Sequence, residues 1–184
     1  KQRKGGGHMH RKSWLALGYT VPVSPSKARV YIWRKLKECG AEYFKQGVAV
    51  LPNFSQSMQQ FSMLAQKIRQ MGGEASIVEL RFIDPVDEAQ MTARFRKQVE
   101  NEYQELLDDC ANALHELRLA GKRLTEPQAE RMKQMVKRYC KTRSKDYFQE
   151  TDTNEIEAGL NEMIDCVKGF ADDLGKQLRS LMEK

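Results

Sequence analysis

Apolar and polar positions along residues 14–83 predict four short strands and two helices. The segment "WLALGYTV", residues 14–21, is short and continuously apolar, which is typical of a buried strand. Apolar residues then recur every three or four positions in two longer segments, as they do on the buried face of a helix. These helical patterns occupy residues 28–39 and 54–71, and three further strand patterns occupy residues 41–45, 48–51 and 75–83.

The order of these elements is strand, helix, strand, strand, helix, strand. It predicts the split βαβ, ferredoxin-like arrangement, in which both helices cover one face of a four-stranded sheet. Gly40 follows the first helical pattern and is expected to end that helix. In the last strand, Val78, Leu80 and Phe82 alternate with polar residues and are expected to face the core together.

The remaining sequence has the pattern of helices. A long helix is expected to begin at Asp84 and to run over residues 85–120, and "TEPQ" at residues 125–128 reads as the capping box of the next helix. Asp152 is expected to cap a last helix, whose apolar stripe runs from Ile156 to Leu181. Each of these three predicted helices carries an apolar stripe. Together they predict an antiparallel helical bundle behind the sheet, and an α+β fold class.

We therefore predict a ferredoxin-like domain over residues 10–84 and a helical bundle over residues 85–184 packed on it. The opening "KQRKGGGHM", residues 1–9, resembles an expression tag or linker, which places the natural start at Met9. Without its three positive charges the formal charge of +6 falls to +3, too little to indicate nucleic-acid binding by itself. No apolar run reaches about 18 residues, and no signal sequence is visible, so we expect a cytoplasmic protein without a membrane span.

The charges form alternating blocks. Residues 11–72 carry +8, residues 73–109 carry −6, residues 110–148 carry +6 and residues 149–184 carry −5. Either these blocks offset one another within the fold, or one or two basic surfaces meet an anion.

One candidate basic surface lies on the helix after residue 125. Lys133, Lys137, Lys141 and Lys145 recur every four residues and share one face while the helix lasts, with Arg138 beside them. Such a row could follow the phosphates of a nucleic acid. The alternative is a solvated face opposite the core.

A second candidate basic surface lies on the first helix. Arg29 and Arg34 flank Trp33 there, and both arginines are candidate nucleic-acid contacts. The alternative is that Trp33 packs on the sheet while the stems of neighbouring lysines cover apolar surface.

The sequence offers little for catalysis, and we predict no enzyme, no cofactor and no metal site. There is no glycine-rich phosphate loop outside the predicted tag, and His115 is the one histidine beyond residue 10. The four cysteines, Cys39, Cys110, Cys140 and Cys166, lie far apart without a C-x-x-C motif. Buried, reduced thiols are expected.

Residues 14–53, "WLALGYTVPVSPSKARVYIWRKLKECGAEYFKQGVAVLPN", carry an R-x-x-x-W-R-x-L helix pattern followed by a G-A-x-x-x-x-x-G-V-x-V-L-P hairpin pattern. Together they resemble the start of the N-terminal domain of the ChrB chromate-resistance family. The segment "GGEASIVELRFIDPVDEAQMTARF" resembles the family's next segment, and the likeness extends to about Leu181. The first strand, helix and hairpin also resemble the Cas2-like domain of PaaX-type repressors. The matching positions of the first segment are Arg29, Trp33, Arg34, Leu36, Gly40, Ala41, Gly47, Val48, Val50, Leu51 and Pro52.

This resemblance implies a regulatory protein linked to chromate resistance, either an anion-responsive transcriptional regulator or its N-terminal module. Operator DNA and chromate or sulfate are the implied partners. Two alternatives remain. A nuclease of the Cas2 kind would carry an aspartate at the end of the first strand, where "LGYTVPV" has no carboxylate. An interaction module without a ligand would pair with a basic protein or with a second copy.

A divalent oxyanion needs two or three converging cationic groups. Arg81, expected on the last strand, is the first candidate for such a site, with Arg94 near the end of that strand. The alternative is that Arg81 pairs with Glu79 on the exposed face of the sheet.

Overall fold

The computed structural model describes residues 12–22, 27–119, 124–168 and 171–183. The predicted tag over residues 1–9 and the predicted natural start at Met9 lie outside these described residues. The elements confirm the α+β class and the order strand, helix, strand, strand, helix, strand followed by helices. Their bounds are β1 Trp14–Thr20, α1 Lys27–Glu38, β2 Glu42–Lys45, β3 Val48–Pro52, α2 Ser55–Gln70, β4 Glu74–Leu80, α3 Pro85–Leu119, α4 Glu126–Arg143, α5 Asn154–Lys168 and α6 Asp172–Met182.

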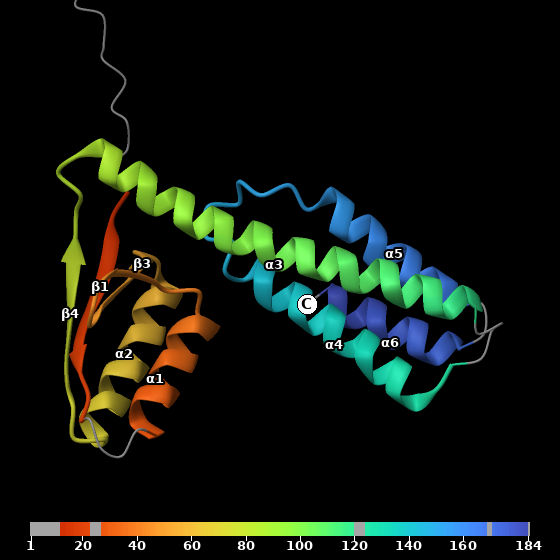
Figure 1. Cartoon of the computed structure of the whole chain (residues 1–184), viewed down its shortest axis with the longest axis horizontal. Coiled ribbons are helices and arrows are strands. Elements are labelled where there is room, and N and C mark those ends of the chain that lie inside the picture. Colours follow the sequence, from red (N-terminus) through yellow and green to blue (C-terminus); the bar gives the residue numbers. More distant parts are fainter. Residues whose placement is uncertain (1–11, 23–26, 120–123, 169–170, 184) are drawn as a thin grey trace, which may run out of the picture. The chain divides into compact units, whose positions relative to one another are not determined.

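The four strands form one antiparallel sheet in the order β2-β3-β1-β4. This is the strand order of the ferredoxin-like arrangement that the sequence predicts. Helices α1 and α2 lie side by side on one face of the sheet (Figure 1). Gly40 follows α1 with φ of 70°, and Gly47 links β2 to β3 with φ of 74°. Both turns use backbone conformations that other residues adopt at a steric cost.

The central strand β1 is buried on both of its faces. Trp14, Leu15, Ala16 and Leu17 are each at most 2% exposed, although successive side chains of a strand point in opposite directions. On one face the Trp14 ring contacts the ring of Phe82, with centroids 5.7 Å apart. The apolar run at the start of the sequence is therefore explained by burial from two sides.

The side chains of β4 differ from the prediction in two respects. Phe82 is 8% exposed as expected, but Val78 is 55% exposed, because the aromatic cluster around Trp14 covers only one end of that face. The strand also ends at Leu80 rather than at residue 83. Arg81, predicted on the strand, lies just beyond it.

The predicted starts of α3, α4 and α5 are confirmed by their caps. The backbone N–H of Val86 donates to Asp84 Oδ1 at 2.8 Å, and that of Asn154 donates to Asp152 Oδ1 at 2.9 Å. Thr125 forms the predicted capping box with Gln128. Each of these side chains satisfies a backbone donor that the first helical turn leaves without a partner.

The last predicted helix, with a stripe from Ile156 to Leu181, is wrong as one element, because the structure has two helices, α5 and α6. Ala171 before α6 is not helical, and Asp172 and Asp173 form the acidic first turn of α6. The two helices approach closely at Gly175, where a Cβ atom would lie 2.4 Å from Lys168 Cγ.

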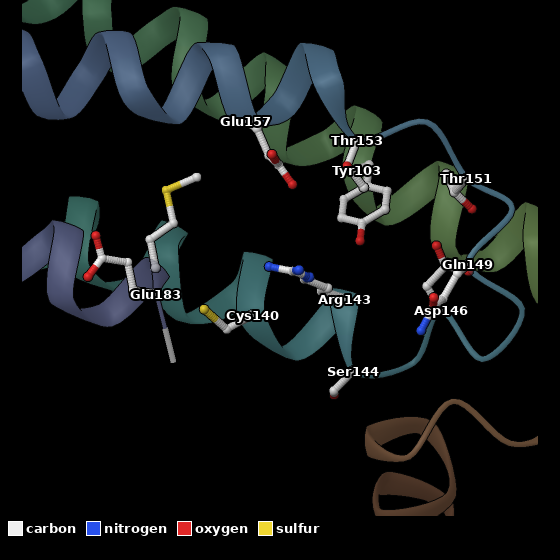
Figure 2. A pocket seen from close by; sticks show the side chains of 11 residues that line it. Tyr103, Cys140, Arg143, Ser144, Asp146, Gln149, Thr151, Thr153, Glu157 and Glu183 are labelled. Carbon is white, nitrogen blue, oxygen red and sulfur yellow. The ribbon is translucent and has the colours of Figure 1, made fainter. Parts of the chain in front are cut away.

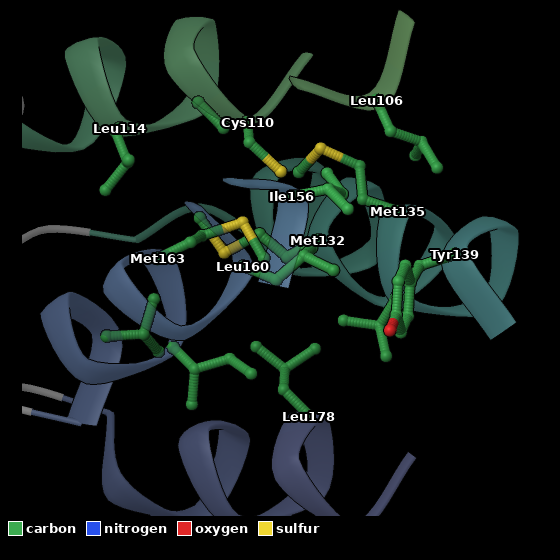
Figure 3. Packing of buried hydrophobic residues seen from close by; sticks show 14 of the residues in the cluster. Leu106, Cys110, Leu114, Met132, Met135, Tyr139, Ile156, Leu160, Met163 and Leu178 are labelled. Atoms are coloured by element: carbon green, nitrogen blue, oxygen red, sulfur yellow. The ribbon is translucent and has the colours of Figure 1, made fainter. Parts of the chain in front are cut away.

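Side chains from α3, α4, α5 and α6 meet in one hydrophobic cluster (Figure 3). Its members include Leu106, Val136, Leu160 and Leu178, each fully buried. The chain divides into two compact units, unit 1 ending at Phe95 and unit 2 beginning at Arg96. The boundary falls inside α3, some ten residues after the predicted domain boundary at residue 84. Among the described helices, none has the length and hydropathy needed to cross a membrane.

Candidate functional site

The outer side of α1 carries an exposed tryptophan among cationic side chains. Ala28, Ile32 and Leu36 bury the inner side of this helix, which leaves the positions between them in solvent. Trp33 is 52% exposed, and Lys37 Nζ lies 5.5 Å from the centre of its ring. The alternative that Trp33 packs on the sheet is therefore wrong. We call the exposed residues Arg29, Val30, Trp33, Arg34 and Lys37 the α1 surface.

The predicted lysine row on α4 is shorter than expected. The helix ends at Arg143, so Lys145 does not continue the row. Its side chain is 8% exposed, and its ammonium lies 2.6 Å from Glu102 Oε1. We call the remaining residues, Lys133, Lys137 and Lys141, the α4 lysine row.

Arg138, predicted beside this row, is held by acidic residues of α3. Its guanidinium lies 2.6 Å from Asp109 Oδ2 and 3.4 Å from Glu105 Oε2. A nucleic-acid phosphate would have to compete with both carboxylates for it. At this position, therefore, a basic residue and acidic residues pair with one another within the fold, which is the first of the two interpretations of the charge blocks.

The two predicted oxyanion-binding arginines are engaged differently. Arg94 on α3 forms an ion pair of 2.8 Å with Glu42 on β2. Arg81 is exposed, and none of the ion pairs among the described residues involves it. The predicted alternative partner, Glu79, accepts a hydrogen bond from Asn53 instead. The structure thus records no convergence of Arg81 and Arg94, and their role in binding an oxyanion stays a prediction.

Unit 2 contains a pocket that the sequence did not indicate. It has a volume of about 570 Å³ and lies among α3, α4, the residues after α4 and the start of α5 (Figure 2). Its lining residues are Tyr103, Cys140, Arg143, Ser144, Asp146, Gln149, Thr151, Thr153, Glu157, Met182 and Glu183.

Tyr103 lines this pocket, and Tyr139 lies behind it with its ring centre 6.0 Å from that of Tyr103. Tyr103 is 4% exposed, and its hydroxyl is buried without a hydrogen-bond partner among the described atoms. Burial raises the pKa of Tyr103 to about 12; Asp146 adds to this rise and Arg143 opposes it. Tyr139 donates its hydroxyl to Glu157 Oε1, and burial together with this hydrogen bond raises the pKa of Tyr139. At neutral pH both hydroxyls therefore keep their protons.

A positive φ marks the segment that closes the pocket. Gln149 has φ of 51°, the one such value among the described residues other than glycine. This conformation is sparsely populated for side chains other than those of asparagine and aspartate. No sequence signal reveals the pocket itself, because its lining residues from α3, α4 and the following segment meet only after folding.

The cysteines are free thiols in the described part of the chain. Cys39 and Cys110 are buried as predicted, and burial raises the pKa of the Cys110 thiol to about 11. The prediction of burial is wrong for Cys140 and Cys166, which are only partly buried. Cys140 lines the pocket and donates its S–H to the Leu181 carbonyl at 3.2 Å.

Comparison with known proteins gives a family for this architecture. The family model described as "Protein ChrB, N-terminal" matches residues 29–181, which is most of the chain and spans both units. The chain belongs to the ChrB N-terminal family. Protein ChrB of Cupriavidus metallidurans is 29% identical over 101 residues, a match that covers 55% of this chain and 31% of that relative. The ChrB family is associated with chromate resistance, so the resemblance stated from the sequence is confirmed.

Proposed function

We propose that this chain is a regulatory module of the ChrB family that contacts nucleic acid through the α1 surface. The single observation that carries the proposal is the exposed Trp33 on a helix with two arginines and a lysine. Aromatic rings beside cations bind nucleic acids, since bases stack on the ring while the cations neutralise phosphates. A buried tryptophan would not serve this purpose, and Trp33 is 52% exposed.

The α4 lysine row offers a second cationic feature, in unit 2. Lys137 and Lys141 are exposed, and they take part in none of the ion pairs formed among the described residues. Without a carboxylate to displace, they can neutralise phosphates at little cost. In this proposal they contribute to affinity for the backbone, and chromate regulates the release of the nucleic acid.

The nuclease alternative is not supported by any observation comparable to the exposed Trp33. A metal-dependent phosphodiesterase needs carboxylates to hold its metal ions. At the end of β1, however, the Tyr19 hydroxyl lies 3.1 Å from the Tyr43 hydroxyl, and no carboxylate belongs to that strand.

Binding to the DNA upstream of the protein's own gene tests the proposal. We expect Arg34→Ala to weaken binding and to reduce the slope of log K against log salt by about 0.9, the loss of one phosphate contact on duplex DNA. Trp33→Ala is expected to weaken binding with little change in this slope, because stacking involves no counterion. Fluorescence anisotropy of labelled DNA across salt concentrations gives both quantities.

Lys67→Ala is the matched control, because Lys67 is an exposed cation on α2 of the same unit. It should leave affinity and slope unchanged. The absence of any binding at low salt would contradict the proposal. A loss confined to Lys137→Ala and Lys141→Ala would move the interface to the α4 lysine row. Addition of chromate to the complex tests the regulatory part separately.

A further inference from the structure

The pocket in unit 2 combines buried hydrogen-bonding groups that have no partner. The hydroxyls of Tyr103 and Thr151 are both buried, and neither makes a hydrogen bond with a described atom. In Figure 2 the Tyr103 hydroxyl points into the hollow on the side where Arg143 lies. Buried polar groups without partners destabilise a fold. Two of them at one hollow indicate that something else completes their hydrogen bonds.

Opposite charges line the same pocket without neutralising each other. Arg143 and Asp146 both line it, and neither takes part in the ion pairs that the structure shows among its described residues. Both still act on Tyr103, where Asp146 raises the pKa of the hydroxyl and Arg143 lowers it. The pocket therefore presents a free guanidinium and a free carboxylate to whatever occupies it.

The remaining charges decide which ligand fits. Glu157 and Glu183 also line the pocket, so carboxylates outnumber the guanidinium there. A divalent oxyanion would be attracted by Arg143 but repelled by the carboxylates of Asp146, Glu157 and Glu183. A simple cation would meet the reverse difficulty at Arg143. A molecule with one anionic and one cationic group satisfies both sides at once.

We propose that this pocket binds a small zwitterion of the amino-acid class. Its carboxylate would be held by Arg143 and the hydroxyl of Tyr103, because a guanidinium and a hydroxyl donor match carboxylate oxygens. Its ammonium group would be held by Asp146. The volume of about 570 Å³ lies within the range of small-molecule sites. This site is distinct from the α1 surface and does not depend on nucleic-acid binding.

Thermal unfolding of the full chain tests the proposal with defined probes. Each free L-amino acid is added separately, and sodium sulfate, sodium chromate, sodium acetate and ethylamine hydrochloride serve as probes with one kind of charge. We expect at least one amino acid to raise the melting temperature more than acetate or ethylamine does, since a ligand of the folded state stabilises it. The proposal is overturned if no amino acid raises the melting temperature, or if acetate or ethylamine alone raises it as much; sulfate and chromate report separately on oxyanion binding elsewhere.

Variants then locate the site. Arg143→Gln and Asp146→Asn should each weaken binding of the stabilising amino acid by about tenfold or more, the loss of one charged contact. Lys141→Gln is the matched control, because it removes an exposed charge on the same helix that does not line the pocket. Unchanged binding in both pocket variants would overturn the assignment. Thermal unfolding without ligand shows whether each variant is folded. If Arg143→Gln does not fold, Asp146→Asn still tests the site.

Discussion

Trp14→Ala is expected to lower the free energy of unfolding of unit 1 by about 3–5 kcal/mol, as for other large aromatic residues removed from a core. The side chain is fully buried, with its ring 5.7 Å from that of Phe82 and 5.6 Å from that of Phe95. Its indole N–H also donates to Glu88 Oε1 at 3.1 Å. Alanine would leave a cavity between the sheet and the first turns of α3, and the surrounding rings could fill it only in part.

Trp33→Ala is the matched control, because it makes the same change at an exposed site. It should alter the free energy of unfolding by about 0.5 kcal/mol or less, since Trp33 is 52% exposed. Urea unfolding followed by far-ultraviolet circular dichroism compares the two variants with the parent protein. Equal losses from both substitutions would contradict the different burial of the two tryptophans.

The two tryptophans also show what sequence alone can and cannot predict. Trp14 begins a continuous apolar run, and the run predicts a buried strand, which the structure confirms. Trp33 stands among polar residues of an amphipathic helix, where both an exposed and a buried position were open. Its exposure follows from the helical phase, since Ile32 and Leu36 already occupy the side that faces the core.

Local signals were sufficient wherever one segment determines its own structure. Caps such as Asp84 and the capping box at Thr125 act within a few residues of themselves, and the helices begin where these residues predict. The sequence pattern does not predict the separation of α5 from α6, because the apolar stripe continues through it. The acidic pair Asp172 and Asp173 favours a new helix start at this place.

The candidate sites were harder to predict because they depend on contacts between distant segments. Sequence shows that Arg94, Arg138 and Lys145 are cationic but not that Glu42, Asp109 and Glu102 hold them. The pocket in unit 2 is a further example, since its lining comes from several helices and the segment after α4. A charge count thus located basic blocks correctly while leaving open which cations remain free to bind a partner.

Lys145→Met is expected to lower the free energy of unfolding of unit 2 by about 2–3 kcal/mol. Lys145 Nζ lies 2.6 Å and 2.7 Å from the two carboxylate oxygens of Glu102, which also accepts a hydrogen bond from Thr142 Oγ1 at 2.8 Å. Removal of the lysine leaves a partly buried carboxylate without its counter-charge. The effect should be somewhat smaller than for a fully buried pair, since the Glu102 side chain is 25% exposed.

A second substitution separates loss of the charge pair from loss of packing. Adding Glu102→Gln to Lys145→Met removes the unpaired carboxylate while keeping an acceptor for Thr142, so most of the lost stability should return. Lys141→Met, at an exposed position in the last turn of α4, should change the free energy of unfolding by about 0.5 kcal/mol or less. Urea unfolding of the parent protein, Lys145→Met, the double variant and Lys141→Met measures these differences. If the double variant is as unstable as Lys145→Met alone, the lysine stabilises unit 2 through packing of its stem rather than through its charge.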